Sequence, residues 1–414
     1  MTVLDHRAVT HPTVRWLGVP HLLAGTAEGP VGRDRHRELH GPLTLPTRAE
    51  LRRDVARARL RGRGGAAFPV YRKLDSLPDH GAHAVVVNGS ESEPASHKDR
   101  VLMRLAPHLV VDGALGVAHA LGAARVVVAV HDVEAGHAMA RAVAGRPDAA
   151  HVEVVAAEGG FVAGEARALL NGLSGVAPLP DGRRTLPTTR GLDARPTFVS
   201  NAETFAQLGL LVTDGLDRML ATGTAEEPGT TLVTLLGSVD HPGVVEVPHG
   251  IALADLLGHE RTPVLVGGYH GSWVAGAGDA VLDRDALATA GTPWGAGVLA
   301  RLGPDTCALG EVQRVVAWLA ARSAGQCGPC VFGLPAVADA VADVVRGGGP
   351  TAVTRVRTLV GLVDGRGACA HPDGTSRFVG SALRTLSGEV EVHAAHGGCG
   401  RPVLGQLPLD GGAR

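Results

Sequence analysis

Aromatic residues and cysteines are scarce in this chain of 414 residues, and each shortage argues against a class of protein. Phe, Trp and Tyr make up 3% of the sequence, so the core must be filled by Ala, Val, Leu and Gly. The cysteines number five, and an odd count argues against the disulfide framework of small secreted domains. The formal net charge of −2 offers no electrostatic basis for binding nucleic acid.

Long hydrophobic runs are also missing. The first residues, MTVLDHRAVTHPTVRW, lack the basic region and apolar run of a secretory signal. The longest apolar stretch, from Leu109 to Val130, is interrupted by Asp112, His119 and Arg125, which indicates a buried helix followed by a buried strand. We therefore expect a cytoplasmic protein without a membrane span, which would lie at the periphery of a membrane complex only through partner subunits.

The remaining composition is that of a globular chain with two or three domains, because 45% of the residues are hydrophobic and 19% are charged. Thr47 and Glu50 form the pattern of a capping box at a helix start. Strands and helices then alternate, which predicts an α/β domain with a largely parallel sheet. The expected strands are 84–87, 124–130 and 152–156, and the expected helices are 107–121 and 134–144.

Shifts in composition divide the chain into five segments. We predict an irregular N-terminal arm over 1–45, the α/β domain over 46–228, a compact β-rich unit over 229–285, a helical domain over 305–392 and a flexible tail over 393–414. Within the helical domain, the apolar periodicity predicts helices from about Glu311, and over 334–345, 354–363 and 377–386.

Four segments of the α/β domain carry residues suited to binding a cofactor. Gly62-Arg63-Gly64-Gly65, followed by Lys73, could bring backbone amides and positive charge to a phosphate, although a glycine cluster is equally typical of a plain loop. Carboxylates and an amide follow the strand at 84–87, where ligands of parallel sheets bind, but a solvated loop would also look like this. The other two segments, 159–165 and 200–204, are each as typical of turns or helix caps.

One cysteine pair stands apart from the rest. Cys327 and Cys330 form a C-x-x-C turn flanked by Gly325, Gly328 and Pro329, which can direct two thiolates at one metal ion or cluster.

Taken in order, these motifs resemble those of one family, the flavin-binding F subunit of NADH-quinone oxidoreductase, the respiratory complex I. The family pattern reads GRGGAGFP with a following Lys, NADEGEPGTFKDR, YICGEE and PTxVNNVET. The present chain reads GRGGAAFP with Lys73, NGSESEPASHKDR, FVAGEA and PTFVSNAET, with order and spacing kept over about 45–390. The segment GTTLVTLLGSVDHPGVVEVP resembles the family's ubiquitin-like module, so the resemblance implies a small β-grasp unit between the α/β and helical domains.

The resemblance implies that the chain binds FMN. The cofactor-binding residues that it indicates are Gly62, Arg63, Gly64, Gly65, Lys73, Asn88, Glu91, Glu93, Phe161, Gly164, Glu165, Asn201 and Thr204. The residues that serve NADH in the family are less well kept. Ser76 and Leu186 stand where the family has aromatic residues, and Leu74 stands where it has the Trp beside the Lys. Ser90 and Ala166 stand where the family has carboxylates. Loss of two stacking rings removes about 1–3 kcal/mol each, so we expect NADH to bind weakly at best.

The iron–sulfur motif of the family is altered as well. The resemblance implies cluster ligands at Cys327, Cys330 and Cys369, while the remaining ligand position is Ala324. Three thiolates can hold a three-iron cluster, or a four-iron cluster with one ligand of another kind, for which His371 and Cys399 are candidates. A lost cluster and a zinc site on the same three cysteines are the alternatives. Cys307 is expected to be a core residue.

The resulting hypothesis is an oxidoreductase subunit in which FMN passes electrons to an iron–sulfur cluster. By analogy with the family we expect a hetero-oligomer with a two-iron ferredoxin-like subunit or a larger iron–sulfur protein. The alternative is a non-catalytic assembly subunit that keeps the fold as a docking platform. Bound flavin would distinguish the two.

Overall fold

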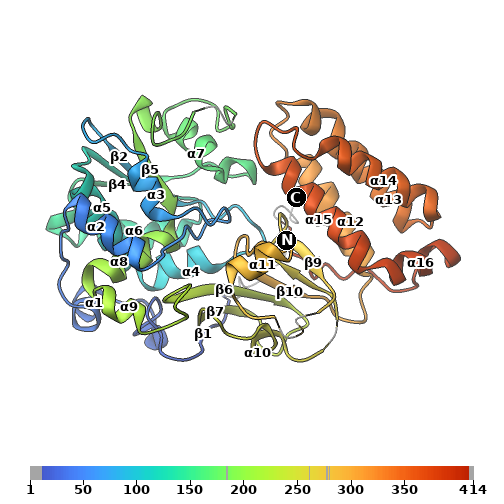
Figure 1. Ribbon diagram of the computed structural model, residues 1–414, viewed down its shortest axis with the longest axis horizontal. Helices are drawn as coiled ribbons and strands as arrows, with labels where there is room; N and C mark the ends of the chain where they lie inside the picture. Colours follow the sequence, from blue (N-terminus) through green and yellow to red (C-terminus); the bar gives the residue numbers. More distant parts are fainter. Residues whose placement is uncertain (1–11, 183–184, 261, 277, 279, 410–414) are drawn as a thin grey trace, which may run out of the picture.

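The computed structural model describes residues 12–182, 185–260, 262–276, 278 and 280–409. The first residues of the predicted arm and the last residues of the predicted tail, 1–11 and 410–414, lie outside the described part of the chain. The α/β region, a second sheet and a group of helices lie next to one another (Figure 1).

The first layer is a four-stranded sheet in which all neighbouring strands are parallel, as the alternation of strands and helices predicted. Its spatial order is β4 (Val152–Ala156), β3 (Arg125–Val130), β2 (Ala84–Gly89) and β5 (Thr197–Asn201). Alternate residues of β2 face opposite sides, so Val85 and Val87 lie in the main core while Ala84 and Val86 lie in a smaller one. The small core is closed by α7 (Ala166–Leu173).

The larger helices of this region pack in the main core on the other face of the sheet. They are α2 (Arg48–Arg57), α4 (Lys98–Leu105), α5 (Pro107–Leu121), α6 (Val133–Ala144) and α8 (Ala202–Thr213). The predicted capping box is present at the start of α2, where Thr47 accepts from the Glu50 amide and Glu50 accepts from the Thr47 amide. The predicted helix 107–121 is confirmed as α5.

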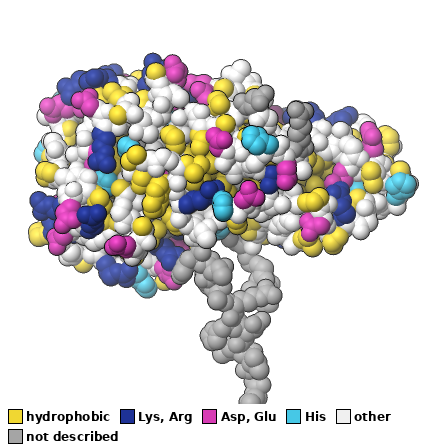
Figure 2. Space-filling view, turned by 90° about the horizontal axis from the view of Figure 1, so that it is seen from below, with side chains coloured by type: hydrophobic (Ala, Val, Ile, Leu, Met, Phe, Trp, Pro, Cys, Tyr) yellow, Lys and Arg dark blue, Asp and Glu magenta, His cyan; other side chains and the backbone are white. Residues whose placement is uncertain are grey.

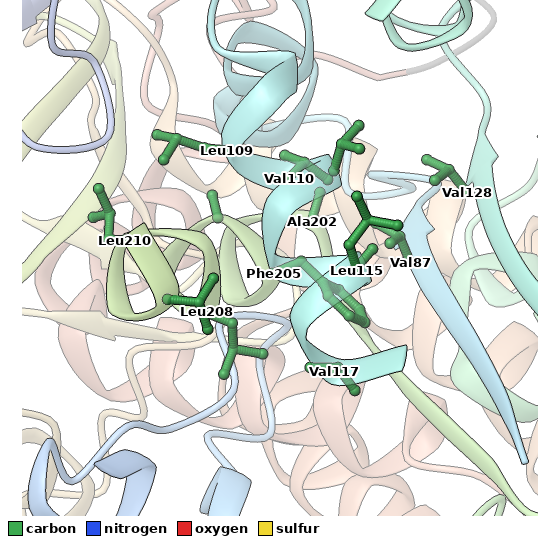
Figure 3. Close-up of a cluster of buried hydrophobic side chains, with 14 of the residues drawn as sticks. Val87, Leu109, Val110, Leu115, Val117, Val128, Ala202, Phe205, Leu208 and Leu210 are labelled. Atoms are coloured by element: carbon green, nitrogen blue, oxygen red, sulfur yellow. The ribbon is translucent and has the colours of Figure 1, made fainter. Parts of the chain in front are cut away.

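A close crossing of α5 and α8 forms the centre of this core (Figure 3). A Cβ added to Gly113 of α5 would lie 1.8 Å from the carbonyl oxygen of Phe205, and one added to Gly209 of α8 would lie 2.2 Å from that of Leu109. Only glycine allows the two backbones to approach this closely. The crossing holds the start of α8 beside the carboxyl end of the sheet.

The second sheet has six strands of mixed direction. Its order is β1 (Val14–Trp16), β7 (Gly243–Pro248), β6 (Thr230–Gly237), β10 (Val298–Arg301), β8 (Val264–Val266) and β9 (Ser272–Val274). Within the predicted β-rich unit, β6 and β7 pair in antiparallel fashion, and α10 (Leu253–Leu257) and α11 (Arg284–Thr289) lie beside the sheet. β1 pairs in parallel with β7, so the predicted arm contributes a strand, and it also contains α1 (Arg33–His40).

The last layer is helical. Its members are α12 (Ala308–Ala321), a π-helical turn (Pro329–Gly333), α13 (Leu334–Val345), α14 (Gly349–Val363), α15 (His371–Thr385) and α16 (Ser387–His396). They share a core with Tyr269 and Trp273, which come from the end of the second sheet. The predicted helix 334–345 matches α13, whereas α14 and α15 begin several residues before their predicted starts.

The segment after α16, which we predicted to be flexible, packs against α12 in its described part. The carboxylate of Glu311 accepts hydrogen bonds from the amides of Gly405, Gln406 and Leu407. The Leu407 side chain is fully buried. An acidic side chain in the first turn of α12 therefore holds this segment in place.

Charges of both signs are interspersed over the face shown in Figure 2, in keeping with the net charge of −2. Among the described residues, no single helix is long and apolar enough to cross a membrane. α4 and α5 together would reach that length and composition, but they are bent by 93°.

Candidate functional site

Two asparagines lie side by side at the carboxyl edge of the parallel sheet. Asn88 of β2 is the register partner of Asn201 of β5. Ligands of open α/β sheets bind at this edge, so the sheet itself places these two predicted cofactor residues at the expected site. Asn201 also caps α8, accepting a hydrogen bond from the Glu203 amide.

The glycine loop Gly62–Gly65 lies against this edge. Gly64 is exposed, and a Cβ added to it would lie 3.2 Å from the Asn201 Cβ. Gly65 has a φ of +93°, a conformation that favours glycine. The Arg63 amide donates to the Thr204 hydroxyl at 2.9 Å, which ties the loop to the first turn of α8. The loop thus leaves backbone exposed directly beside Asn201, as an anion-binding loop requires.

Lys73 supplies a half-buried cation beside β5. Its Nζ donates to the Val199 carbonyl of β5 at 2.7 Å. Burial lowers the pKa of this ammonium to about 8. An approaching phosphate would reverse part of that shift, because an opposite charge favours the protonated form.

The Arg63 side chain takes a different course from the one predicted. Its guanidinium is buried, donates to His249 Nε2 at 2.9 Å and lies within 4.0 Å of the carboxylates of Glu203 and Glu227. Burial, together with the charge of Arg284, lowers the pKa of Arg63 to about 9. Its charge is already paired inside the protein, so we assign the contribution of this loop to its backbone amides.

A buried ion cluster supports the site from below. The Lys98 ammonium lies 3.0 Å from Asp99 Oδ1 and 2.9 Å from Glu203 Oε2, and all three side chains are buried. Asp99 Oδ2 in turn accepts from Asn201 Nδ2 at 2.6 Å. Burial raises the pKa of Asp99 to about 6, against the opposing effect of Lys98. These three charges were not among the predicted site residues. The matching KDR segment was the signal for Lys98 and Asp99, and the matching PTFVSNAET segment was the signal for Glu203.

Glu91 and Glu93 hold the loop after β2 rather than presenting free carboxylates. Glu91, at a φ of +40°, accepts from the amides of Asp99 and Arg100, from the Ser96 hydroxyl and from Arg100 Nε. Glu93 accepts from the Tyr269 amide at 2.9 Å. Both predicted residues therefore position the loop, and Glu93 connects it to the second sheet.

The segment 159–165 packs onto the same loop. Asn88 Nδ2 donates to the Gly164 carbonyl at 2.9 Å. A Cβ on Gly164 would lie 2.2 Å from the Ser92 Oγ, so only glycine fits there. Ser90, where the family has Asp, is buried, and its Oγ has no hydrogen-bond partner among the described residues. Glu165 caps α7.

Phe161 faces the helical layer instead of the sheet edge. Its ring meets His270, Trp318 and His371 edge-on, with centroids 4.8, 5.1 and 5.5 Å away. These contacts join the loop before α7 to α12 and α15, the helices that flank the cysteines. Phe161 therefore connects the two predicted cofactor regions.

The predicted cluster cysteines come together around the π-helical turn. Cys327 Sγ and Cys330 Sγ are 3.7 Å apart. Burial raises the pKa of the Cys330 thiol to about 11, and the charges of Cys327 and Cys369 act in the same direction. Insertions of π-helix are frequent at functional sites. Cys330 thus interacts with both of the other predicted cluster cysteines.

The two candidates for a fourth cluster ligand are engaged elsewhere. His371 is buried, with Nδ1 3.0 Å from His270 Nε2 and Nε2 3.0 Å from the Leu319 carbonyl, so both ring nitrogens have partners. The Cys399 Sγ lies in a group with Cys307, Glu389 and His393.

The substituted nicotinamide positions are mostly at the surface. Leu186 is 57% exposed, and exposed Ser76 donates its hydroxyl to the Lys73 carbonyl. Leu74, in contrast, is a core residue. The places where the resemblance implies stacking rings therefore hold an exposed aliphatic side chain and a small polar one.

Comparison with known proteins decides the family. Residues 55–209 match the Nuo51 FMN-binding domain, and residues 310–393 match the NADH-ubiquinone oxidoreductase-F iron–sulfur binding region. The F subunit of NADH-quinone oxidoreductase from Mycobacterium tuberculosis is 30% identical over 374 residues, which cover 82% of this chain and 83% of that protein. This chain belongs to the family of NADH-quinone oxidoreductase F subunits. The resemblance seen in the four sequence motifs is confirmed.

Other relatives of this F-subunit family member extend the likeness. The Escherichia coli F subunit is 27% identical over 88% of this chain and 90% of its own length. A component of the NADP-reducing hydrogenase of Solidesulfovibrio fructosivorans is 27% identical over 84% of this chain and 76% of its own length. The crystal structure of an NAD+-reducing [NiFe]-hydrogenase in the H2-reduced state shares the fold, with a TM-score of 0.80 and 24% identity over 93% of this chain and 68% of that chain.

The residues at the sheet edge fit FMN. The exposed glycine backbone and the Lys73 ammonium are donors for a phosphate, and the buried Ser90 hydroxyl lacks a partner among the described residues. The carboxylates below the edge are paired and do not oppose an anion. The chain thus has an FMN-binding domain and an iron–sulfur binding region, and electron transfer from flavin to an iron–sulfur centre is the activity that these two domains support.

Proposed function

We propose that this chain is an electron-transfer subunit in which FMN lies at the carboxyl edge of β2 and β5 and its electrons leave through a cluster on three cysteines. The observation that carries the proposal is the pairing of Asn88 with Asn201 beside the exposed Gly64. FMN can accept an electron pair and release single electrons, so it can couple a two-electron donor to a one-electron cluster.

Each part of the chain has a distinct task in this proposal. The amides of Gly62–Gly65, with Lys73 and Thr204, hold the phosphate end of FMN. Asn88 and Asn201 orient its polar groups. The loop with Glu91 and Glu93, together with the segment of Gly164 and Glu165 that packs onto it, excludes water from one side. Phe161 lies between this region and the helices that carry the cysteines. In this proposal, these contacts hold the flavin region and the cluster region at a fixed position relative to each other.

The cluster ligands in this proposal are Cys327, Cys330 and Cys369. Because His371 has partners at both ring nitrogens, and Cys399 lies with another set of ligands, we propose a cluster with three protein thiolates. A three-iron cluster, or a four-iron cluster with one non-protein ligand, satisfies that count.

The domain limits 46–228, 229–285 and 305–392 belong to the same proposal. The β-rich unit would be the family's ubiquitin-like β-grasp module. Its support is the mixed sheet, in which antiparallel β6 and β7 lie beside β10 in parallel with β6, with α10 connecting toward β8. β1 and β10, which come from outside 229–285, complete the sheet.

We further propose that NADH is not the main electron donor. Exposed Leu186 and Ser76 provide no ring to stack on nicotinamide or adenine, and Ala166 provides no carboxylate for a ribose. The other donor in this proposal is a ferredoxin partner that feeds electrons in the reverse direction. The relatives are named as subunits, so we expect this chain to act in a hetero-oligomer with iron–sulfur partners.

The test is the visible spectrum of the purified full chain under anaerobic conditions, before and after adding NADH and then dithionite. We expect a flavin band that dithionite bleaches and NADH leaves nearly unchanged. A band that NADH bleaches at once would overturn the donor assignment. Absence of flavin even after reconstitution with FMN would overturn the whole proposal and favour the docking-platform alternative.

A further inference from the structure

A second group of metal-ligating side chains lies in the helical layer, apart from the cluster cysteines. Cys307 precedes α12, Glu389 and His393 lie on α16, and Cys399 follows α16. One ligand atom from each residue lies within 4.8 Å of the others. Neither the FMN site nor the cluster uses any of these residues.

The separations of the ligand atoms match a tetrahedral zinc site. Cys307 Sγ is 3.4 Å from both Glu389 Oε1 and His393 Nε2, and the last two atoms are 3.8 Å apart. Zinc bonds of about 2.3 Å to sulfur and about 2.0–2.2 Å to nitrogen and oxygen place tetrahedral ligands roughly 3.3–3.8 Å from one another. These three atoms could therefore bind one ion with little movement.

The histidine is already oriented as a ligand. His393 Nδ1 lies 2.6 Å from the Val345 carbonyl oxygen, which can only accept, so Nδ1 carries the proton. The lone pair is then on Nε2, the atom that faces Cys307. Metal-bound histidines are commonly held by such a hydrogen bond on the opposite nitrogen.

The other ligands are positioned by the surrounding structure. Glu389 Oε2 accepts from Arg401 Nη2 at 2.6 Å, and Oε1 accepts from the Leu309 amide at 3.0 Å while lying 3.4 Å from the Cys307 sulfur. Glu389 and His393 are four residues apart on α16 and therefore lie on one face. Cys307 Sγ accepts from the Gly310 amide at 3.2 Å, which fixes the position of the sulfur atom.

We propose that Cys307, Glu389, His393 and Cys399 bind a structural Zn²⁺ ion. Two sulfurs, one imidazole nitrogen and one carboxylate oxygen form the ligand set of a closed four-coordinate site. The ion would join the start of α12 to α16 and to the segment that follows it. That segment is the one whose amides bind Glu311, so zinc and carboxylate together would secure the described part of the C-terminal segment.

A disulfide between Cys307 and Cys399 is the competing use of the same sulfur atoms. A disulfide would give no role to the oriented His393 Nε2, whereas Glu389 Oε1, which accepts from the Leu309 amide at 3.0 Å, also lies beside the sulfur. The histidine therefore favours zinc.

The experiment is elemental analysis of the full chain, purified with reductant and dialysed against a weak chelator. We expect about one zinc per chain in addition to the cluster iron. Cys399→Ser and His393→Gln should lower the zinc content at least tenfold while iron and flavin absorbance stay unchanged. Cys327→Ser should lower iron and retain zinc, and His396→Gln, an exposed histidine on the same helix, should retain both.

Substitution by cobalt provides a second readout that does not depend on folding of the variants. Co²⁺ added to metal-stripped wild-type protein should give the intense visible bands of a tetrahedral site with thiolate ligands. Three results would overturn the proposal: wild-type protein without zinc or cobalt bands after incubation with either metal, an intact Cys307–Cys399 disulfide in the native protein, or loss of cluster iron in Cys399→Ser.

Discussion

Two regions of the molecule differ in how their polar groups are supported. One is the edge of the parallel sheet at Asn88 and Asn201, here called the flavin edge, and the other is the part of the helical layer around Cys327 and Cys330, here called the thiol end. At the sheet edge, Lys98 is paired with two buried carboxylates, and Glu91 accepts four hydrogen bonds. At the thiol end, one of the family's ligand positions is Ala324, and three thiols remain.

The difference teaches which family residues can be replaced without loss of the fold. Removing one member of a buried ion cluster leaves an uncompensated charge and costs about 3–5 kcal/mol. Replacing a side chain at the surface, as at Ser76 and Leu186, usually changes stability by about 0.5 kcal/mol or less. The charges that hold the flavin edge are therefore kept, while groups that would only touch NADH or complete a cluster have changed.

The largest expected effect is at the thiol end. Cys327→Ser should abolish the visible and paramagnetic signals of the cluster, because two thiolates cannot hold a cluster that already lacks one protein ligand. Flavin absorbance should remain. Cys307→Ser is the matched control, since that cysteine lies in the other group of ligands and its loss should leave cluster iron intact. A normal cluster in Cys327→Ser would contradict the ligand assignment.

At the flavin edge, Lys98→Met should lower the free energy of unfolding by about 3–5 kcal/mol, because the buried carboxylates of Asp99 and Glu203 would lose the ammonium that they share. The measurement is urea denaturation followed by circular dichroism. The double variant Lys98→Met with Glu203→Gln should recover part of the loss. Equal stability of Lys98→Met and wild type would show that the ion cluster is not what supports this edge.

The substituted NADH positions can be tested by restoring the residues that the family has there. Phe at Ser76 and Leu186, with Glu at Ala166, should strengthen NADH binding, since each stacked ring contributes about 1–3 kcal/mol. The rate at which NADH bleaches the flavin should rise by about tenfold or more for the triple variant. Ser76→Leu with Leu186→Ile is the apolar control. No gain would mean that the nicotinamide site differs beyond these positions.

The smallest effect is the dependence of FMN affinity on pH. Burial lowers the pKa of Lys73 to about 8, whereas the unfolded chain keeps this charge up to about pH 10.4. The affinity of the apoprotein for FMN should be greatest below pH 8 and fall above it, by about tenfold per pH unit at most. Over the same range the contribution of Lys73 to stability rises with pH, because the unfolded chain binds more protons than the folded one.

Titrations of apoprotein with FMN over this pH range, compared with Lys73→Met, would check the assignment. The variant should bind more weakly at neutral pH and show no fall at higher pH. An identical decline in both proteins would place the titrating group elsewhere.

The sequence by itself determined the α/β pattern and the family. β-branched runs that alternate with amphipathic stretches predicted β2, β3, β4, α5 and α6 within a few residues, because these elements depend on periodicity along the chain. The capping box of α2 was equally visible, since both partners lie within one turn. Cofactor motifs kept in order then indicated FMN and iron–sulfur chemistry, which the matched domains confirm.

Only the tertiary structure decided how distant side chains are used. β1 joins the second sheet by pairing with β7, Arg63 turns toward His249 and Glu203, and Cys399 lies beside Cys307 instead of the cluster. In each case the partners are far apart in sequence, so no local pattern could match them. Which charge is neutralised and which thiol meets which ligand depend on how the layers pack, and the packing is a property of the whole chain.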